Sequence, residues 1–218
     1  MKFKAIIFDM DGTIINSENL WSESSLHMLK VKGKVKEDKE CKKILSELKG
    51  ASLYTTCAFI KMTYNTLESV EELIQQKEDF VFKNFASLVS FIDGFEQFHH
   101  KISKQGMRSA IATNATLSTL EYTTKHFPLS KFFNEHIYCI DHVNKKPKPE
   151  PDVFLYAADM IDMQPQECVV IEDSAHGIAA AKAAGMFCIG INTGKNKQAL
   201  SQADIIVEHY DEIDLEKL

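Results

Sequence analysis

The stretch "AIIFDMDGTI", residues 5–14, is the most informative segment of this chain. Residues 3–8 ("FKAIIF") are mostly apolar, rich in isoleucine and phenylalanine, and too short for a helix, so they predict a buried strand. The apolar run ends in Asp9 and Asp11, one residue apart, with Gly12 directly after them. Two carboxylates therefore lie where a buried strand is predicted to end. Their role has to be inferred from the rest of the sequence.

Two structural explanations compete with a functional one. Asp11-Gly12 is a common turn signal and can simply close a loop. A calcium-binding EF-hand loop also alternates aspartates, but it follows a helix and carries a glutamate at its twelfth position. Counted from Asp9, that position is Leu20, and a strand-like run precedes the motif. The calcium loop is therefore disfavoured, and the simple turn has to be weighed against the residues at the ends of the other strands.

The composition is that of an ordinary globular protein with a sizeable core: 218 residues, 44% hydrophobic and 26% charged. A net charge of −6 offers no basic footprint for nucleic acid. No apolar run approaches the ~20 residues of a membrane helix, and the N-terminus turns acidic too early for a signal peptide. The five cysteines form no C-x-x-C pair, which favours buried, reduced thiols. We expect a cytoplasmic monomer without nucleic-acid or membrane partners.

Residues 17–91 form a block of different character, rich in serine, lysine and glutamate and without a strand pattern. An amphipathic helix is predicted within 66–91, with a capped start near Thr66, Ser69 and Glu72. Weaker helices are predicted over 17–33 and 36–50, each ended by a glycine. The block is too long for a simple crossover, so we interpret it as an inserted domain.

After Asp93-Gly94 the pattern alternates between helices and strands. Strands are predicted over 108–113, 135–140, 167–172, 186–191 and 203–207, and helices over 95–106, 117–127, 152–161 and 175–185. Apolar strands that alternate with helices predict a parallel sheet covered on both faces. The expected fold is thus α/β: a Rossmann-like core made of residues 1–16 and 92–218, with 17–91 as a small helical domain inserted into it.

In such sheets ligands bind beyond the carboxyl ends of the strands, so the residues directly after each strand are the candidates for a site. They are Asp9 and Asp11 after the first strand, Thr113 and Asn114 after the second, Lys148 ahead of the helix over 152–161, and Glu172 and Asp173. Taken alone, Lys148 fits a solvated linker, and Asp173-Ser174 fits a helix N-cap, which does not exclude a metal or anion site. The convergence of acids, a hydroxyl and a lysine on one edge disfavours the simple turn.

Carboxylates at both Asp9 and Asp173 repel each other unless a cation lies between them. Ligation by oxygen atoms alone favours Mg²⁺, which takes one or two carboxylates, several waters and a substrate phosphate. A lysine and a hydroxyl nearby suit the remaining phosphate oxygens. The chemistry therefore points to Mg²⁺ and a small phosphorylated metabolite.

Four segments make the whole chain resemble the haloacid dehalogenase superfamily of phosphotransferases. They are "DMDGT" (9–13), "TN" (113–114), "KPEPDVF" (148–154) and "EDSAHGI" (172–178). Each is a weak match alone, but all four occur in the order and spacing of the family. The block 17–91 resembles the α-helical cap of the β-phosphoglucomutase and sugar-phosphatase branch.

The resemblance implies that Asp9 is a nucleophile that forms an aspartyl-phosphate and that Asp11 is the general acid and then the base. A carboxylate nucleophile splits one difficult step into two easier ones, and the cations offset the repulsion between anionic partners. Thr113 and Lys148 are the matching phosphate-site residues, and Gly12 allows a close approach of the backbone. Because the dehalogenases of the superfamily lack the second acid, Asp11 disfavours dehalogenation.

The same resemblance implies a magnesium site and leaves the substrate open. Its expected ligands are Asp9, the backbone carbonyl of Asp11, and Asp173, with Glu172 behind them. Asn114 and Lys49 are further candidates for substrate binding. Lys146 competes with Lys148 because "KKPKPEP" permits two registers; the one that places Asp152 and Phe154 in the family pattern selects Lys148.

We expect a phosphatase that acts on a sugar or polyol phosphate. The alternative is a mutase of the β-phosphoglucomutase type; a non-catalytic phosphate-responsive module, such as a receiver domain, is disfavoured by the length and the helical insert. Where the mutases carry a histidine and a cap arginine, this chain has Trp21 and Leu53. Only His27 and Lys49 are cap residues with a case for reaching the substrate.

Overall fold

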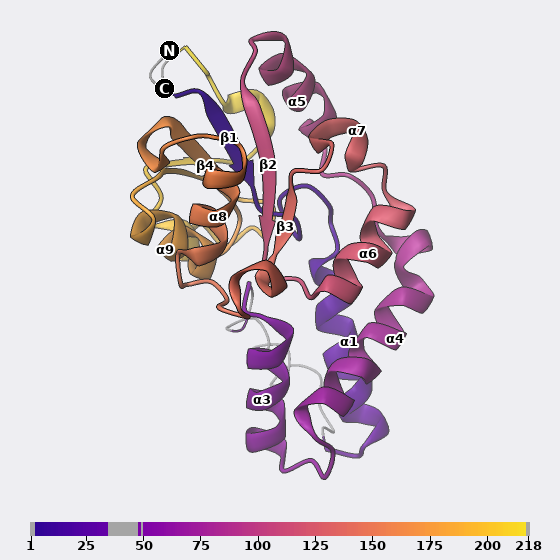
Figure 1. Ribbon diagram of the computed structural model, residues 1–218. Helices are drawn as coiled ribbons and strands as arrows, with labels where there is room; N and C mark the ends of the chain where they lie inside the picture. Colours follow the sequence, from indigo (N-terminus) through magenta and orange to yellow (C-terminus); the bar gives the residue numbers. More distant parts are fainter. Residues whose placement is uncertain (1–2, 35–47, 49, 217–218) are drawn as a thin grey trace.

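The computed structural model describes residues 3–34, 48 and 50–216, and its centre is a six-stranded parallel sheet (Figure 1). The spatial order of the strands is β3-β2-β1-β4-β5-β6. Their bounds are β1 Ala5–Phe8, β2 Arg108–Thr113, β3 Ile137–Cys139, β4 Cys168–Glu172, β5 Phe187–Ile191 and β6 Ile205–Val207. The predicted α/β fold is thereby confirmed, with the strand predicted over 135–140 reduced to three residues.

Helices cover both faces of the sheet because successive side chains of a strand point to opposite sides. In β1, Ile6 and Phe8 join one apolar cluster, whereas Ala5 and Ile7 join the other. The first cluster is completed by α5 (Phe95–Lys104), α6 (Leu117–His126) and α7 (Ser130–Phe133), and the second by α8 (Asp152–Met160) and α9 (Ala175–Ala183). Burial on both faces explains why the strand reads as a continuous apolar run.

Four short 3₁₀ helices connect the main elements of the core. They are η1 (Ile140–Val143), η2 (Pro165–Glu167), η3 (Lys197–Leu200) and η4 (Tyr210–Glu212). The last of them lies against the start of the chain, since the Tyr210 hydroxyl donates a hydrogen bond to the Thr13 carbonyl at 2.9 Å. The C-terminal segment therefore supports the loop that carries Asp9 and Asp11.

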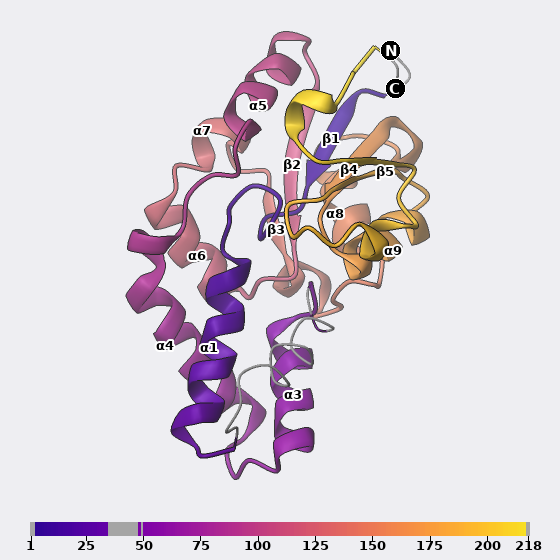
Figure 2. The same cartoon turned by 180° about the vertical axis from the view of Figure 1, so that it is seen from behind.

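A cap of helices lies beyond the carboxyl ends of the strands, seen from two sides in Figures 1 and 2. It contains α1 (Glu18–Val31), α3 (Leu53–Tyr64) and α4 (Val70–Leu88). The three helices share a small apolar cluster of their own: Leu26, Met28, Leu29, Cys57, Ile60 and Leu73. Near the core, Leu20, Val81 and Phe85 belong instead to the apolar cluster that α5, α6 and α7 complete on one face of the sheet. The cap is thus a separate layer that is packed onto the core along α1 and α4.

The predicted cap helices agree with the structure in part. The helix within 66–91 begins after Ser69, whose side chain forms the expected reciprocal capping box with Glu72. The structure adds α3, which the sequence pattern misses because its threonines and aromatic residues show little contrast between two faces. Ser52, which accepts a hydrogen bond from the Thr55 amide at 3.1 Å, is the start signal that identifies it. The helix predicted over 36–50 lies almost entirely outside the described residues.

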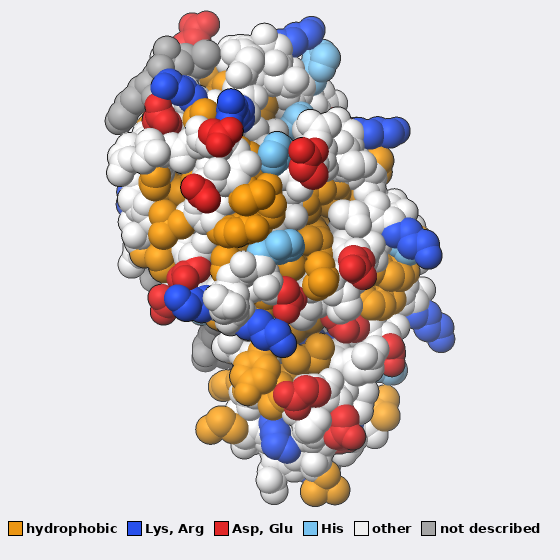
Figure 3. All heavy atoms as spheres, in the orientation of Figure 1, with side chains coloured by type: hydrophobic (Ala, Val, Ile, Leu, Met, Phe, Trp, Pro, Cys, Tyr) orange, Lys and Arg blue, Asp and Glu red, His pale blue; other side chains and the backbone are white. Residues whose placement is uncertain are grey.

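The surface carries charges of both signs over core and cap, as the face in Figure 3 shows. Among the residues that the structure describes, no helix combines the length and apolar character that a membrane crossing requires. Cys57, Cys139, Cys168 and Cys188 are buried free thiols, as expected.

Candidate active site

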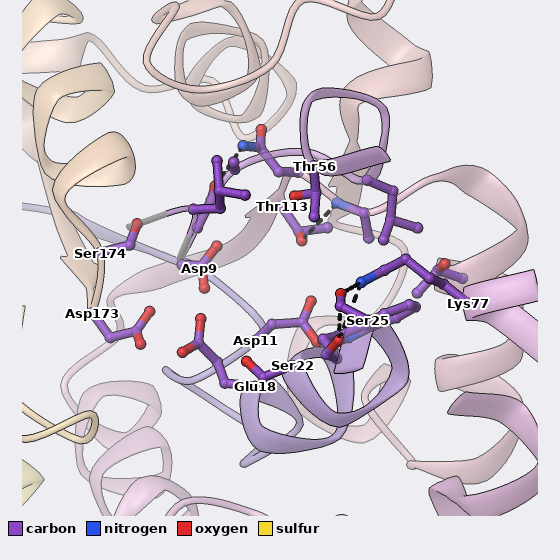
Figure 4. A pocket seen from close by; sticks show the side chains of 18 residues that line it. Asp9, Asp11, Glu18, Ser22, Ser25, Thr56, Lys77, Thr113, Asp173 and Ser174 are labelled. Atoms are coloured by element: carbon purple, nitrogen blue, oxygen red, sulfur yellow. Dashed lines mark hydrogen bonds between the residues drawn. The ribbon is translucent and has the colours of Figure 1, made fainter. Parts of the chain in front are cut away.

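The predicted site residues meet at the carboxyl edge of the sheet because three parallel strands end there. Phe8 of β1 is in register with Ile111 of β2 and Ile171 of β4. The next positions along the three strands therefore lie side by side and bring together the segments that carry Asp9, Thr113, Glu172 and Asp173. Asp9, Thr113 and Asp173 line one cavity between core and cap, of about 110 Å³ (Figure 4).

Lys148 lies at the back of this edge, buried between two carboxylates. Its amino group donates hydrogen bonds to Asp9 Oδ1 at 2.6 Å and to Glu172 Oε1 at 2.8 Å, and only 2% of the residue is exposed. Burial disfavours its charge, but the two carboxylates outweigh that effect and raise the pKa of Lys148 above its usual value. Lys146 instead pairs with Asp152 at the surface, at 2.8 Å. The geometry therefore favours Lys148 for the phosphate-site role.

Burial and the neighbouring charges do not all act on the Asp9 carboxyl group in the same direction. Burial raises the pKa of Asp9 well above its ordinary value; Lys148 opposes this shift, and the negative charges of Glu172 and Asp173 reinforce it. Oxygen atoms of Asp9, Glu172 and Asp173 lie within 4.8 Å of one another, and all three residues are buried. A divalent cation at this place favours the ionised form of all three carboxylates, so the donor set fits the predicted Mg²⁺.

Both oxygens of Glu172 are already used within the protein. Oε1 accepts from Lys148, and Oε2 accepts from the amide and the hydroxyl of Ser174, at 2.8 and 2.9 Å. Ser174 in turn caps α9. These contacts support the prediction that Glu172 acts from behind the metal ligands, orienting Lys148 and Ser174 rather than binding the ion itself.

Two glycines allow these carboxylates to approach the backbone. Gly12 has φ +87°, and a Cβ atom there would lie 2.3 Å from Asp173 Oδ2. At Gly177 a Cβ atom would lie 1.6 Å from Glu172 Oε1. The glycine of the first motif therefore has a steric reason at this site, which is the room that it leaves for Asp173.

Asp11 lies on the cap side of Asp9 and is held by α1. Its Oδ1 accepts hydrogen bonds from the Ser17 hydroxyl and from the indole N–H of Trp21, the latter at 3.3 Å. Burial raises the pKa of Asp11 above its ordinary value, and these two hydrogen bonds oppose the shift. A raised pKa suits a carboxyl group that has to deliver and then accept a proton.

Asn114 connects the core to the cap. Its side-chain oxygen accepts from the Lys148 amide at 2.8 Å, and its side-chain nitrogen donates to the Gly50 carbonyl at 2.9 Å. The amide group is therefore engaged in holding two backbone segments, and its predicted contact with substrate stays a prediction. Lys49, the neighbour of Gly50, lies outside the described residues.

The cap contributes side chains to the cavity that the sequence pattern does not single out: Glu18, Ser22 and Ser25 of α1, Thr56 of α3 and Lys77 of α4. Trp21 and Leu53 line it as well. His27 does not line it: the residue is exposed and its ring lies 4.8 Å from the ring of Phe80, so the structure gives no support to the case for His27 as a substrate contact.

Lys77 is the most unusual of these cap residues. It is 2% exposed, and its amino group donates to the Trp21 carbonyl at 3.1 Å and to the Ser25 hydroxyl. Burial lowers the pKa of Lys77 to about 8. The sequence does hold a signal for it: Leu73, Val81 and Phe85 are buried at four-residue spacing, and Lys77 occupies the remaining place in that row.

With the geometry established, comparison with known proteins decides the family. The family described as haloacid dehalogenase-like hydrolase matches residues 6–191. The chain belongs to this family.

Known relatives and solved structures align with this hydrolase over most of its length. Validoxylamine A 7'-phosphate phosphatase of Streptomyces hygroscopicus subsp. limoneus is 25% identical over 211 residues, covering 97% of this chain and 96% of that protein. Pyrophosphatase PpaX of Bacillus cereus (strain ATCC 10987 / NRS 248) is 30% identical over 185 residues, covering 85% and 81%. The β-phosphoglucomutase of Clostridium difficile superposes with a TM-score of 0.81 at 22% identity, covering 99% and 95%. The last likeness confirms the fold, including the helical cap.

Proposed function

We propose that this chain is a Mg²⁺-dependent phosphatase that hydrolyses a small phosphomonoester through an aspartyl-phosphate on Asp9. The observation that carries the proposal is the buried group formed by Asp9, Lys148, Glu172 and Asp173, of which Asp9 and Asp173 line a cavity. A cation-neutralised carboxylate facing a cavity is what attack on an anionic ester requires. That two relatives are named a phosphatase and a pyrophosphatase supports phosphate release as the reaction class.

In the first step, Asp9 attacks phosphorus and the bond from phosphorus to the ester oxygen breaks. Asp11 transfers its proton to that oxygen, so the alcohol leaves as a neutral molecule. In the second step, Asp11 takes a proton from water, the water oxygen attacks phosphorus, and the bond from phosphorus to the Asp9 oxygen breaks. The products are inorganic phosphate and the free Asp9 carboxylate. Lys148 and the Thr113 hydroxyl bind the phosphoryl oxygens in both steps. Asp9, the Asp11 carbonyl and Asp173 would hold Mg²⁺, which would supply positive charge next to the phosphoryl group.

Phosphatase activity is favoured over mutase activity by the cap. A mutase has to hold a bisphosphate at both ends in turn, and an arginine fork is the best group for that grip. The corresponding place has Leu53, and Trp21 stands where the mutases have a histidine; both line the cavity here. The indole of Trp21 donates to Asp11 and cannot exchange a proton at pH 7. Among the described residues, the cap does supply a buried cation to the cavity, Lys77.

The proposal is tested with p-nitrophenyl phosphate. We expect Mg²⁺-dependent release of phosphate by the wild type, loss of that activity in Asp9→Asn, and an acid-labile phosphoryl group on Asp9 of Asp11→Asn. Phosphate release that survives in Asp9→Asn at the wild-type rate would overturn the mechanism. No release from any phosphomonoester with Mg²⁺ present would overturn the activity.

A further inference from the structure

The amino group of Lys77 is a buried cation with no carboxylate partner among the described residues. It belongs to α4, is 2% exposed and donates to the Trp21 carbonyl and the Ser25 hydroxyl. Within residues 3–34, 48 and 50–216, no aspartate or glutamate forms an ion pair with it. Two of the three donors of an ammonium group are thus used, and the remaining one is available to the cavity that Lys77 lines.

The adjacent carboxylate does not neutralise this charge. Glu78 is buried too, but its Oε1 accepts hydrogen bonds from three hydroxyls at the start of α6, those of Thr116, Ser118 and Thr119, at 2.8, 2.7 and 2.9 Å. Consecutive residues of α4 therefore have separate roles. Glu78 links the cap to the core through its hydrogen bonds, and Lys77 lines the cavity.

The position of Lys77 in the cavity is opposite the reacting carboxylates. Figure 4 shows its amino group pointing inward from the cap side, with Asp9 and Asp173 on the far side. Burying a cation without a counter-ion is costly, so the arrangement is favourable only when an anion joins it. Burial lowers the pKa of Lys77 to about 8, which still leaves the amino group mostly protonated at neutral pH.

We propose that Lys77 binds a second anionic group of the substrate, so that the enzyme prefers phosphomonoesters that carry a carboxylate or a second phosphoryl group at the end remote from Asp9. This inference rests on the proposed function, because it assumes that the transferred phosphoryl group lies at Asp9. Lys77 and Asp9 line the same cavity from opposite sides, so the two anionic ends of one substrate can reach both side chains. Lys77 is then a specificity-determining residue that takes no part in proton or phosphoryl transfer.

The test uses three compounds with one three-carbon skeleton. 3-Hydroxypropyl phosphate has a neutral remote end, 3-phosphonooxypropanoate has a carboxylate there, and propane-1,3-diol bisphosphate has a second phosphoryl group. In the wild type with Mg²⁺, we expect kcat/KM for at least one anionic compound to exceed that for the neutral one by about tenfold or more. The two anionic compounds identify which of the two groups is recognised.

The Lys77→Met variant is expected to lose this discrimination, with the kcat/KM ratio falling to within about threefold of unity, and Lys77→Gln is a second variant that keeps a polar donor. Lys83→Met is the matched control, because Lys83 lies on the same helix, is exposed and does not line the cavity. It should keep the wild-type ratio. The proposal would be overturned if the kcat/KM ratio of the wild type were near one for both anionic compounds. It would also be overturned if both Lys77 variants kept the wild-type ratio.

Binding is measured separately so that the proposed function and this inference fail independently. Trp21 is the only tryptophan of the chain and lines the cavity, so its fluorescence, together with calorimetry, reports occupancy without turnover. In an Asp9→Asn background, we expect the same about tenfold preference for an anionic remote end, and its loss when Lys77→Met is added. Binding without such a preference, or no binding by any of the three, overturns the role of Lys77 even where p-nitrophenyl phosphate is hydrolysed.

Discussion

The amino group of Lys148 lies 2.6 Å from Oδ1 of Asp9, and both side chains are buried. The same amino group reaches Glu172 at 2.8 Å, so one cation serves two carboxylates that come from neighbouring strands. This contact joins a residue near the start of the chain to one that is 139 positions away. The charges of Lys148, Asp9 and Glu172 therefore depend on one another and cannot be assigned to each residue separately.

Asp9→Asn should lower kcat by about a thousandfold or more, because the amide is no nucleophile. The substitution also removes one of three crowded carboxylates, so the fold should persist. Phosphate release and the far-ultraviolet circular dichroism of the variant check both statements. Asp9→Asn with wild-type turnover is the result that contradicts the mechanism.

Lys148→Ala should abolish activity and destabilise the protein by about 3–5 kcal/mol, because it leaves Asp9 and Glu172 buried without their cation. Lys146→Ala is the matched control: its side chain is 58% exposed and pairs with Asp152, so the cost should be about 0.5 kcal/mol or less. Urea unfolding and phosphate release measure the two variants. Activity that depends on Lys146 instead would place the motif two residues earlier.

Removal of divalent metal by EDTA should stop phosphate release, and Mg²⁺ should restore it. Because the single charge of Lys148 cannot balance three buried carboxylates, Mg²⁺ should also raise the melting temperature of the wild type. Asp173→Asn should lose most of that rise, whereas a surface variant such as Lys146→Ala should keep it. A bound zinc ion, or two metal ions about 4 Å apart, would contradict the predicted single Mg²⁺ site.

Lys77→Met should unfold at higher urea concentration than the wild type at pH 7. The pKa of Lys77 falls from 10.5 to about 8 in the fold, so the unfolded chain binds the proton more tightly and the charged form destabilises the native state. That cost is about 3 kcal/mol at neutral pH, and it should shrink as the pH rises from about 8 to about 10.5.

The surroundings of Lys77 simplify this pH test. The thiol of Cys57, on α3, is the titratable group that acts on it, and burial raises the pKa of that thiol to about 11. The Trp21 carbonyl keeps hydrogen bonds from Ser24 and Ser25 when the lysine is absent. Unfolding curves at pH 7 and 9.5, with Lys83→Met as the control, decide the matter. A Lys77→Met variant that is less stable at pH 7 would show that the lysine serves the fold.

With β-glucose 1-phosphate, Mg²⁺ and a bisphosphate primer, the enzyme should release free phosphate rather than accumulate glucose 6-phosphate. Two of the donors of Lys77 are already engaged by Trp21 and Ser25, so its grip on a second phosphate is weaker than that of an arginine fork. Following both products in one assay separates the two activities. Faster formation of glucose 6-phosphate than of free phosphate would establish a mutase.

Much of the core could be predicted because local signals there agree with the tertiary fold. Asp9, Thr113 and Asp173 each lie at the end of an apolar strand, and parallel strands place their carboxyl ends on one edge. The contacts of Asn114 could not be predicted in the same way. Its amide holds Gly50 and Lys148, which are 64 and 34 positions away in sequence, and no local pattern records such distances.

Local sequence patterns were sufficient to predict the parallel sheet, the inserted block of helices, and the acids and lysine at the sheet edge. These follow from periodicity and from residue types that have few other uses at those places. Which cap side chains line the cavity depends instead on packing between distant parts of the chain. Lys77 and Lys83 are the same residue type on one helix, yet Lys77 is buried in the cavity and Lys83 is exposed. The difference comes from the packing of α4 against α1, α3 and α6, because that packing determines which side of α4 loses contact with water.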